Sequence, residues 1–243
     1  MNIALIFAGG IGQRMNTRSV PKQFLRVNGK PIIIHTLEVF EKNHLIDAIV
    51  VSCVQEYINV LYSAIKEFGI SKVKGIVPGG ETGQLSIKNG LEKIANLYPL
   101  NSIVLIHDGV RPLIDNATID RNIESVKNFG SAVTVTRAAE TIGIVDEKGS
   151  LNNIVRRQNV VICRAPQSFI LRDVLNAQRL ALESGIVNMT DTASLMQWYG
   201  KHLAIVEGPI DNIKITTQRD FYTLKSLFDL REFSQLNEVL YNE

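Results

Sequence analysis

The chain opens with a short apolar run, residues 3–7, that leads directly into a glycine turn over residues 8–12. An uncharged run of this length, without polar alternation, is typical of a strand that is buried on both faces of a sheet. Glycines allow positive φ and let backbone N–H groups approach a ligand closely. Arg14 and Lys22 follow the turn and add positive charge. The stretch therefore predicts a strand and turn that bind a polyphosphate.

Strands and helices alternate after this stretch. Further buried-type strands are expected at residues 46–54, 73–77, 102–106 and 132–136. Helical patterns are expected at residues 30–40, 56–68, 87–94 and 118–129. This alternation predicts an α/β fold, a doubly wound and mostly parallel sheet.

Ligands of such sheets bind outside the carboxyl ends of the strands. Three segments rich in glycine or charge fall at that edge, at residues 8–14, 78–86 and 107–112. We therefore expect these three segments to converge on one crevice.

Residues 137–163 interrupt the alternation. Short β-type runs surround a polar turn at residues 146–149, which is typical of a β-ribbon and not of an αβ unit. We interpret 137–163 as a protruding β-arm that joins two copies of the chain in a homodimer. A flap over the chain's own site is the alternative.

The rest of the chain returns to the helix and strand pattern. Helices are expected at 171–184, 193–199 and 218–230, with Thr190 and Asp191 capping the second of them, and β-type runs at 203–206 and 209–217. We assign residues 1–230 to a single domain, and residues 231–243 to a C-terminal tail that carries no signal.

Composition excludes several classes of protein. A hydrophobic content of 45% with 21% charged residues argues against disorder, and a net charge of +2 does not support general nucleic-acid binding. No run approaches the roughly 20 apolar residues of a membrane helix. Cys53 and Cys163 each lie in an apolar run without metal-ligand spacing, so we expect buried free thiols in a cytoplasmic protein.

Three cations are the candidate catalytic residues. Neither a dinucleotide fingerprint nor a Walker loop is complete after the first turn, so Arg14 and Lys22 are the informative features there. Lys214 lies between two isoleucines, where an ammonium group is costly unless it meets an anion. A solvated surface charge is the competing interpretation of each residue.

Asp108 follows a buried strand and is the best metal candidate. Carboxylates at strand ends commonly hold Mg²⁺ between nucleotide phosphates. Asp211 is a second candidate ligand, with a turn role as its alternative. Arg111 either pairs with Asp108 or contacts substrate. We therefore expect Mg²⁺, or another divalent cation, as cofactor.

Several motifs together carry a resemblance to a known family. Residues 8–15 with Pro21-Lys22-Gln23 resemble nucleotidyltransferases that activate sugar phosphates. Residues 107–112, 165–169, 190–191 and 212–217 resemble polyol-phosphate cytidylyltransferases, in the order of that family. The resemblance implies a Rossmann-like nucleotidyltransferase that joins CMP from CTP to a polyol phosphate and releases pyrophosphate.

The resemblance also implies roles for individual residues. Arg14, Lys22 and Lys214 match cations that bind the triphosphate or stabilise its transition state. The nucleotide is expected on the glycine turns, on Ala8, Gly9, Gly10, Gly12, Gly80, Glu81, Ser86 and Asp108. The acceptor is expected on Arg111, Thr141, Arg157 and Thr190, of which Thr141 and Arg157 reach the neighbouring subunit's site from the arm.

The acceptor itself remains open between two polyol phosphates. Residues 190–195 favour 2-C-methyl-D-erythritol 4-phosphate, which we rank first. Phe24, residues 30–33 and the longer tail favour ribitol 5-phosphate. The chain also departs from the family at Gly83, often Arg, at Glu140, usually Asp, and at Arg164-Ala165, usually Gln-Thr. A catalytically silent nucleotide-binding protein is the alternative from another class.

Overall fold

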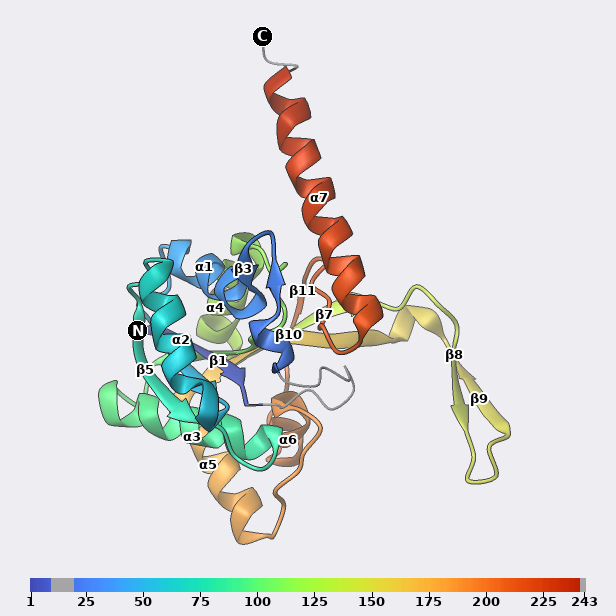
Figure 1. Ribbon diagram of the computed structural model, residues 1–243. Helices are drawn as coiled ribbons and strands as arrows, with labels where there is room; N and C mark the ends of the chain where they lie inside the picture. Colours follow the sequence, from blue (N-terminus) through green and yellow to red (C-terminus); the bar gives the residue numbers. More distant parts are fainter. Residues whose placement is uncertain (10–19, 241–243) are drawn as a thin grey trace.

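The computed structural model describes residues 1–9 and 20–240, and the side chains among them up to residue 233 (Figure 1). Gly10, Gly12 and Arg14 lie outside the described residues. The strands are β1 (Asn2–Ala8), β2 (Arg26–Val27), β3 (Lys30–Pro31), β4 (Ala48–Cys53), β5 (Val73–Pro78), β6 (Ile103–Asp108), β7 (Ser131–Arg137), β8 (Ile142–Val145), β9 (Leu151–Val155), β10 (Val161–Ile170) and β11 (Ile205–Glu207).

Helices connect most of these strands. The α-helices are α1 (Ile32–Lys42), α2 (Ile58–Glu67), α3 (Gly83–Leu97), α4 (Asn116–Phe129), α5 (Leu171–Glu183), α6 (Thr192–Trp198) and α7 (Gln218–Leu240). Short 3-10 helices are η2 (Lys22–Phe24), η3 (Gln55–Tyr57) and η4 (Arg157–Asn159).

Seven of the described strands form one large sheet in the order β11-β7-β10-β6-β1-β4-β5, and β2-β3 and β8-β9 form separate two-stranded sheets. β1 lies in the interior of the large sheet and pairs in parallel with β4 and β6, whereas β10 runs antiparallel to both β6 and β7. This confirms the expected doubly wound, mostly parallel fold. The antiparallel insertion of β10 was not foreseen.

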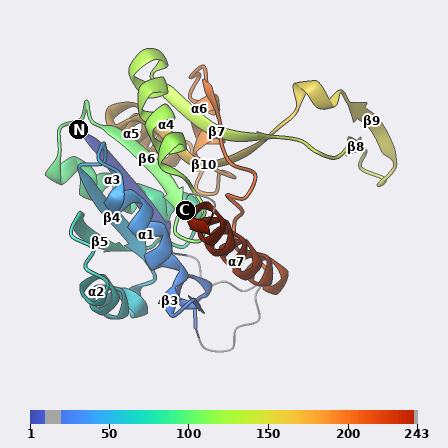
Figure 2. The same cartoon turned by 90° about the horizontal axis from the view of Figure 1, so that it is seen from above.

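Helices cover both faces of the sheet, which explains the uninterrupted apolar run at the start of the chain. Ala4 and Ile6 pack with α1, α2 and α4 in one apolar layer. Ile3 and Leu5 pack with α3, α5 and α6 in the other layer. Figure 2 shows the two helix layers on either side of the sheet. Because alternate β1 side chains face opposite layers, every position of the run must be apolar.

Two helices start at other residues than expected. Lys30 and Pro31 pair with β2 in a small hairpin, so α1 begins only at Ile32. α3 begins at Gly83, four residues before the expected start, because Thr82 caps it by accepting a hydrogen bond from the Leu85 amide. The second glycine turn is therefore shorter than predicted.

The expected β-arm is present and extends away from the body of the molecule (Figure 1). β8 and β9 pair only with each other, and β10 then runs from the arm into the large sheet. Cys163 lies on this strand and is exposed, so the expectation of two buried thiols holds for Cys53 alone. Burial was inferred from apolar neighbours, but here β10 has not yet entered the sheet interior.

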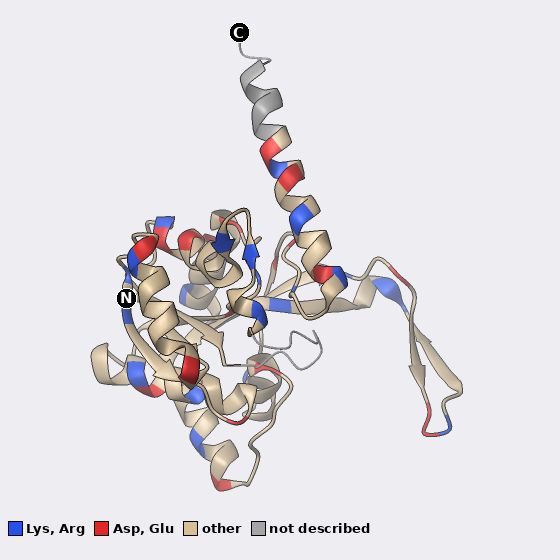
Figure 3. Ribbon diagram, viewed as in Figure 1, with Lys and Arg blue, Asp and Glu red and all other residues tan. Residues whose placement is uncertain are grey.

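Two predictions near the C-terminus were wrong. Residues 209–217 form a loop and not a β-type run, because they cross the edge of the site instead of joining the sheet. α7 continues to Leu240, so most of the segment assigned to a featureless tail is helical and projects from the body. Figure 3 shows charges of both signs along α7. Within the described residues, no helix is long and apolar enough to span a membrane.

Candidate active site

Two adjoining pockets lie at the carboxyl ends of the central strands. The glycine pocket is lined by Phe7, Ala8, Gly9, Lys22, Gln23, Gly80, Glu81, Thr82, Gly83, Ser86, Asp108, Val110 and Lys214. The arginine pocket is lined by Phe7, Gly83, Gln84, Ile87, Ile106, Asp108, Arg111, Cys163, Arg164, Ala165, Gln167, Gln178, Met189, Thr190, Asp191, Thr192, Leu195 and Lys214. Phe7, Gly83, Asp108 and Lys214 belong to both, so the pockets share a wall.

Close backbone packing forms the floor of the glycine pocket. A Cβ atom on Gly79 would lie 3.0 Å from the Cα of Gly9. The Ser86 hydroxyl accepts a hydrogen bond from the Gly80 amide at 3.0 Å and donates to the Thr82 carbonyl at 2.9 Å. The end of β1 thus lies directly against the turn that follows β5, and residues of both turns line one cavity.

Lys22 reaches the glycine pocket from η2. The neighbouring Gln23 is buried and donates a hydrogen bond to the carbonyl of Ala8 at 2.6 Å. This bond ties the segment after the first glycine turn back to the end of β1. It explains why the lysine and the turn meet although Lys22 lies 13 positions after Gly9.

Asp108 is the central charge of the shared wall. Its Oδ1 lies 2.5 Å from the Lys214 ammonium, and its Oδ2 lies 2.7 Å from the Nε of Arg111. Burial alone would raise the pKa of Asp108, but the charges of Lys214 and Arg111 outweigh it and lower the pKa to about 2. The carboxylate is therefore ionised near neutral pH, and it positions two cations.

A loop carbonyl organises the arginines of the second pocket. The carbonyl of Asn212 accepts a hydrogen bond from Arg111 at 2.8 Å and a longer one from Arg164 at 3.4 Å. The Asn212 side chain donates to the carbonyl of Ala165 at 2.7 Å. The loop that carries Lys214 is thus fastened to both β10 and the segment after β6.

His107 lies beneath this cluster and is completely buried. Its Nε2 lies 3.1 Å from the carbonyl of Arg111, which assigns the donor proton to that nitrogen. Burial lowers the pKa of His107 to about 4, more than the carbonyl and Asp108 raise it. The ring is therefore neutral and supports the Arg111 backbone.

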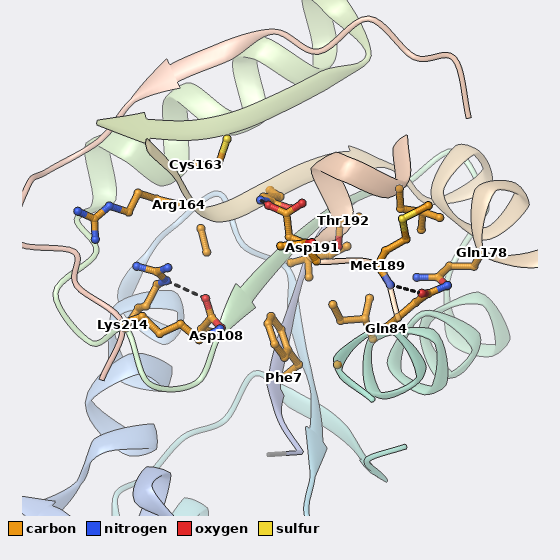
Figure 4. Close-up of a pocket in the computed structure, with 18 residues that line it drawn as sticks. Phe7, Gln84, Asp108, Cys163, Arg164, Gln178, Met189, Asp191, Thr192 and Lys214 are labelled. Atoms are coloured by element: carbon orange, nitrogen blue, oxygen red, sulfur yellow. Dashed lines mark hydrogen bonds and ion pairs between the residues drawn. The ribbon is translucent and has the colours of Figure 1, made fainter. Parts of the chain in front are cut away.

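Uncharged polar groups close the other end of the arginine pocket, which Figure 4 shows opposite Asp108 and Lys214. Gln84 accepts a hydrogen bond from the Met189 amide at 2.8 Å and donates to the carbonyl of Ile186 at 2.9 Å. Gln167 accepts from the Ala193 amide and donates to Asp191, both at 2.8 Å. These bonds fix residues 186–193 as one wall. Asp191 caps α6, as the sequence predicted.

Comparison with known proteins identifies the family. The family model of 2-C-methyl-D-erythritol 4-phosphate cytidylyltransferase (IspD) matches residues 2–229. The chain belongs to this family. It is 50% identical to a ribitol-5-phosphate cytidylyltransferase of Streptococcus agalactiae serotype V, over 97% of this chain and 98% of that protein. Identity to a 2-C-methyl-D-erythritol 4-phosphate cytidylyltransferase of Clostridium acetobutylicum is 34%, over 93% and 97% of the two chains.

A solved structure matches the whole fold as well. The 4-diphosphocytidyl-2C-methyl-D-erythritol synthase of Anaerococcus prevotii superposes with a TM-score of 0.82 and 25% identity, over 94% of this chain and 96% of that one. Membership of the IspD family confirms the resemblance read from the sequence. It also makes the chain a cytidylyltransferase, a kind of nucleotidyltransferase.

Most residues predicted from the resemblance to cytidylyltransferases lie together. Ala8, Gly9, Lys22, Gly80, Glu81 and Ser86 line the glycine pocket. Arg111 and Thr190 line the arginine pocket, and Asp108 and Lys214 lie on the wall between the two. The convergence of the three sheet-edge segments is thereby confirmed for their described residues.

Three predicted residues lie elsewhere. Thr141 and Arg157 are exposed on the arm and line neither of the two pockets. Arg157 instead lines a separate basic surface with Arg137 and Arg156. Asp211 is likewise absent from the lining of both pockets.

Sequence reasoning missed several residues of this candidate site. Phe7 separates the pockets, and Gln84 and Gln167 fix the wall around residues 186–193. Arg164 was noted only as a departure from the family pattern. Gln167 lies within the Ala165-Pro-Gln motif, which is the one signal that pointed to it. For Phe7 and Gln84 no signal stands out, since one resembles a core residue and the other a helix surface.

Proposed function

We propose that the chain is a CTP-dependent ribitol-5-phosphate cytidylyltransferase that makes CDP-ribitol. The comparisons favour this acceptor over 2-C-methyl-D-erythritol 4-phosphate, which the sequence analysis ranked first, since identity is 50% to the ribitol enzyme and 34% to the other. One structural observation carries the activity. A single wall with Asp108 and Lys214 separates a pocket lined by glycine turns from a pocket lined by two arginines.

The two pockets take the two substrates in this proposal. CTP occupies the glycine pocket, where backbone groups of the turns and Glu81 face the nucleotide. The polyol phosphate occupies the arginine pocket, with its phosphate toward the arginines and its hydroxyls toward Thr190 and Asp191. The shared wall then lies where the α-phosphorus meets the acceptor phosphate.

The reaction is an in-line displacement at phosphorus. An oxygen of the acceptor phosphate forms a bond to the α-phosphorus of CTP, the bond from that phosphorus to the bridging oxygen breaks, and pyrophosphate leaves. A phosphate monoester is already ionised at neutral pH, so the step needs no general base. Lys22 and Lys214 stabilise the charge that develops on the phosphoryl oxygens, and the walls position the reactants.

A divalent cation is part of the proposal, with Asp108 as its protein ligand. Mg²⁺ typically binds one or two carboxylates together with substrate phosphates, and Asp108 supplies an ionised carboxylate on the wall between the pockets. The described residues contain no group of three metal-ligating side chains, so most ligands would come from CTP and water. Bound there, Mg²⁺ would neutralise phosphate charge.

We also propose a homodimer that forms through the arm. Val145, Leu151 and Ile154 of the arm are each at least 58% exposed in the single chain. Three exposed aliphatic side chains on an isolated ribbon favour a protein partner. A second copy would cover them and bring Thr141 and Arg157 to the neighbouring acceptor site.

Pyrophosphate release tests the proposed function. The purified chain is incubated with CTP, Mg²⁺ and, in parallel, ribitol 5-phosphate, 2-C-methyl-D-erythritol 4-phosphate or other polyol phosphates. We expect release with ribitol 5-phosphate at the highest kcat/KM. A higher value with methylerythritol phosphate would assign the other acceptor. If none of the acceptors supports pyrophosphate release, the alternative of a catalytically silent nucleotide-binding protein would be favoured.

A further inference from the structure

We propose that Arg164 binds the phosphate of the acceptor and determines which polyol phosphate the enzyme selects. This inference rests on the proposed function and adds to it a residue that the family motifs do not assign. It starts from three observations: the poorly satisfied guanidinium of Arg164, the excess of positive charge around it, and the unusual sequence at this position.

The guanidinium of Arg164 makes only long contacts. Its Nε lies 3.3 Å from the Thr136 hydroxyl, and its Nη1 lies 3.4 Å from the Asn212 carbonyl. Arg111 approaches the same carbonyl at 2.8 Å. An arginine has five N–H donors, so most donors of this half-buried side chain remain available.

No carboxylate compensates the charge of Arg164 within the described part of the chain. Asp108 pairs with Arg111 and Lys214. Asp191, the other acid of the pocket, caps α6 and accepts a hydrogen bond from Gln167. Burial and the neighbouring charge of Arg111 both lower the pKa of Arg164. Two guanidinium groups therefore share one carbonyl, and among the described residues only that of Arg111 also has a carboxylate partner.

A phosphate group fits this arrangement. Arginine is suited to bidentate contact with phosphate oxygens, and a dianion between Arg111 and Arg164 would offset their mutual repulsion. Figure 4 shows Arg164 extending from β10 toward the end of the pocket that holds Asp108 and Lys214. The acceptor phosphate must reach this end, because the wall to the glycine pocket is there.

The sequence at this position connects the site to acceptor choice. Arg164-Ala165 stands where Gln-Thr is usual in the resemblance described above. Ala165 is buried and lines the arginine pocket. Relative to the usual pair, this pocket wall therefore gains a positive charge and loses a hydroxyl and a methyl group. Such a wall suits an acceptor that is held mainly through its phosphate group.

The first test is steady-state kinetics of Arg164→Gln and Arg164→Lys, with Arg172→Gln as control. Arg172 is an exposed arginine on α5 that lines neither pocket. We expect Arg164→Gln to raise the KM for ribitol 5-phosphate about 10- to 100-fold and the KM for CTP less than about 2-fold. Arg164→Lys should recover part of the loss. A larger effect on CTP, or equal effects on both, would overturn the inference.

Thermal unfolding of the free protein separates binding from a structural role. If Arg164 binds an anion, Arg164→Gln removes a like-charge contact, and Tm should stay the same or rise. A structural role predicts a lower Tm, because the contacts to Thr136 and Asn212 are lost. A lower Tm together with an unchanged KM for the acceptor would overturn the inference.

Two further experiments keep this inference distinct from the proposed function. The double variant Arg164→Gln/Ala165→Thr should shift the kcat/KM ratio toward 2-C-methyl-D-erythritol 4-phosphate by about 10-fold or more; an unchanged ratio would refute the role in selection. If the wild type forms no product with any acceptor, the proposed function fails. Inorganic phosphate should even then raise the Tm of the wild type more than that of Arg164→Gln, and equal shifts would refute the anion site.

Discussion

Gly9 and Gly79 bring the ends of β1 and β5 into backbone contact. A Cβ atom on Gly9 would lie 2.6 Å from the Ser86 hydroxyl and 3.3 Å from the Cα of Gly79. Ser86 cannot move freely, because its hydroxyl bonds the Gly80 amide and the Thr82 carbonyl. The floor of the glycine pocket thus leaves no room for a side chain at residue 9.

Gly9→Ala should therefore impair nucleotide binding. The added methyl group displaces Ser86 or separates the two turns, so we expect the KM for CTP to rise about 10-fold or more. Gly75→Ala is the matched control, because a Cβ atom there meets the flexible Lys93 side chain, with Cε at 2.9 Å, and Gly75 lines neither pocket. That variant should change the KM for CTP less than about 3-fold. Equal behaviour of the two variants would contradict the close-packing argument.

Lys22→Ala should slow the reaction far more than it weakens substrate binding. Loss of one positioned electrostatic donor typically costs on the order of 3 kcal/mol of transition-state stabilisation, which is about 100-fold in kcat. Lys42→Ala, an exposed lysine at the end of α1, is the control. Single-turnover kinetics at saturating CTP measures the effect. Near-normal turnover would refute a role for Lys22.

Asp108 should make the protein less stable in acid. Its pKa is about 2 in the folded protein and near 3.8 ordinarily, so the unfolded chain takes up the proton first as pH falls. The ionised carboxylate therefore contributes about 2 kcal/mol to the free energy of unfolding above about pH 4, and this contribution is lost as the pH falls toward 2. Urea unfolding across this range should show a shallower decline for Asp108→Asn. Asp229→Asn, exposed on α7, should follow the wild type.

His107 should affect the free energy of unfolding at higher pH than Asp108 does. Burial lowers its pKa from 6.5 to about 4, so the unfolded state binds a proton between these values while the folded state does not. Stability therefore falls as pH drops from about 6.5 to 4, by about 3 kcal/mol. His107→Gln should flatten the free energy of unfolding in this window, whereas exposed His202→Gln should not. Identical slopes for all three proteins would contradict this assignment.

The arm should determine the oligomeric state. We expect light scattering to give the mass of a dimer for the wild type and to shift toward a monomer for Leu151→Asp/Ile154→Asp. Phe129→Asp, which changes an exposed apolar residue on α4, should leave the mass unchanged. A monomeric wild type would show that the arm serves its own chain.

Arg157→Ala then tests what the arm does for catalysis. If Arg157 reaches the neighbouring acceptor site, its loss should raise the KM for the acceptor about 10-fold or more and leave that for CTP nearly unchanged. The exposed Arg172→Gln variant again serves as control. Equal effects on both substrates would count against this role.

Local sequence predicted much of the site because the chemistry follows directly after buried strands. Asp108 ends a strand whose residues are all buried, and Gly9 follows another, so both had to lie at the ligand-binding edge. The cap at Asp191 was equally visible, since a side-chain acceptor precedes a helical pattern. These features depend on neighbouring residues only.

The parts that were missed depend on residues far apart in the chain. The position of β10 between β6 and β7 follows from pairing partners that no local pattern specifies. This position of β10 leaves Cys163 exposed and brings Arg164 beside Arg111. The length of α7 was missed for another reason: its polar and apolar residues have no amphipathic period, so helix formation there lacks the usual sequence signal.

β10 is a single ten-residue strand that begins at the arm and ends in the middle of the sheet. Val161 lies at its arm end, and Arg164 and Gln167 lie on the wall of the arginine pocket. A shift or rotation of the arm is therefore transmitted to the pocket wall without passing through a loop. If two copies associate through the arm as proposed, we expect changes in that association to alter the arginine pocket as well, so that subunit geometry and substrate choice would evolve together.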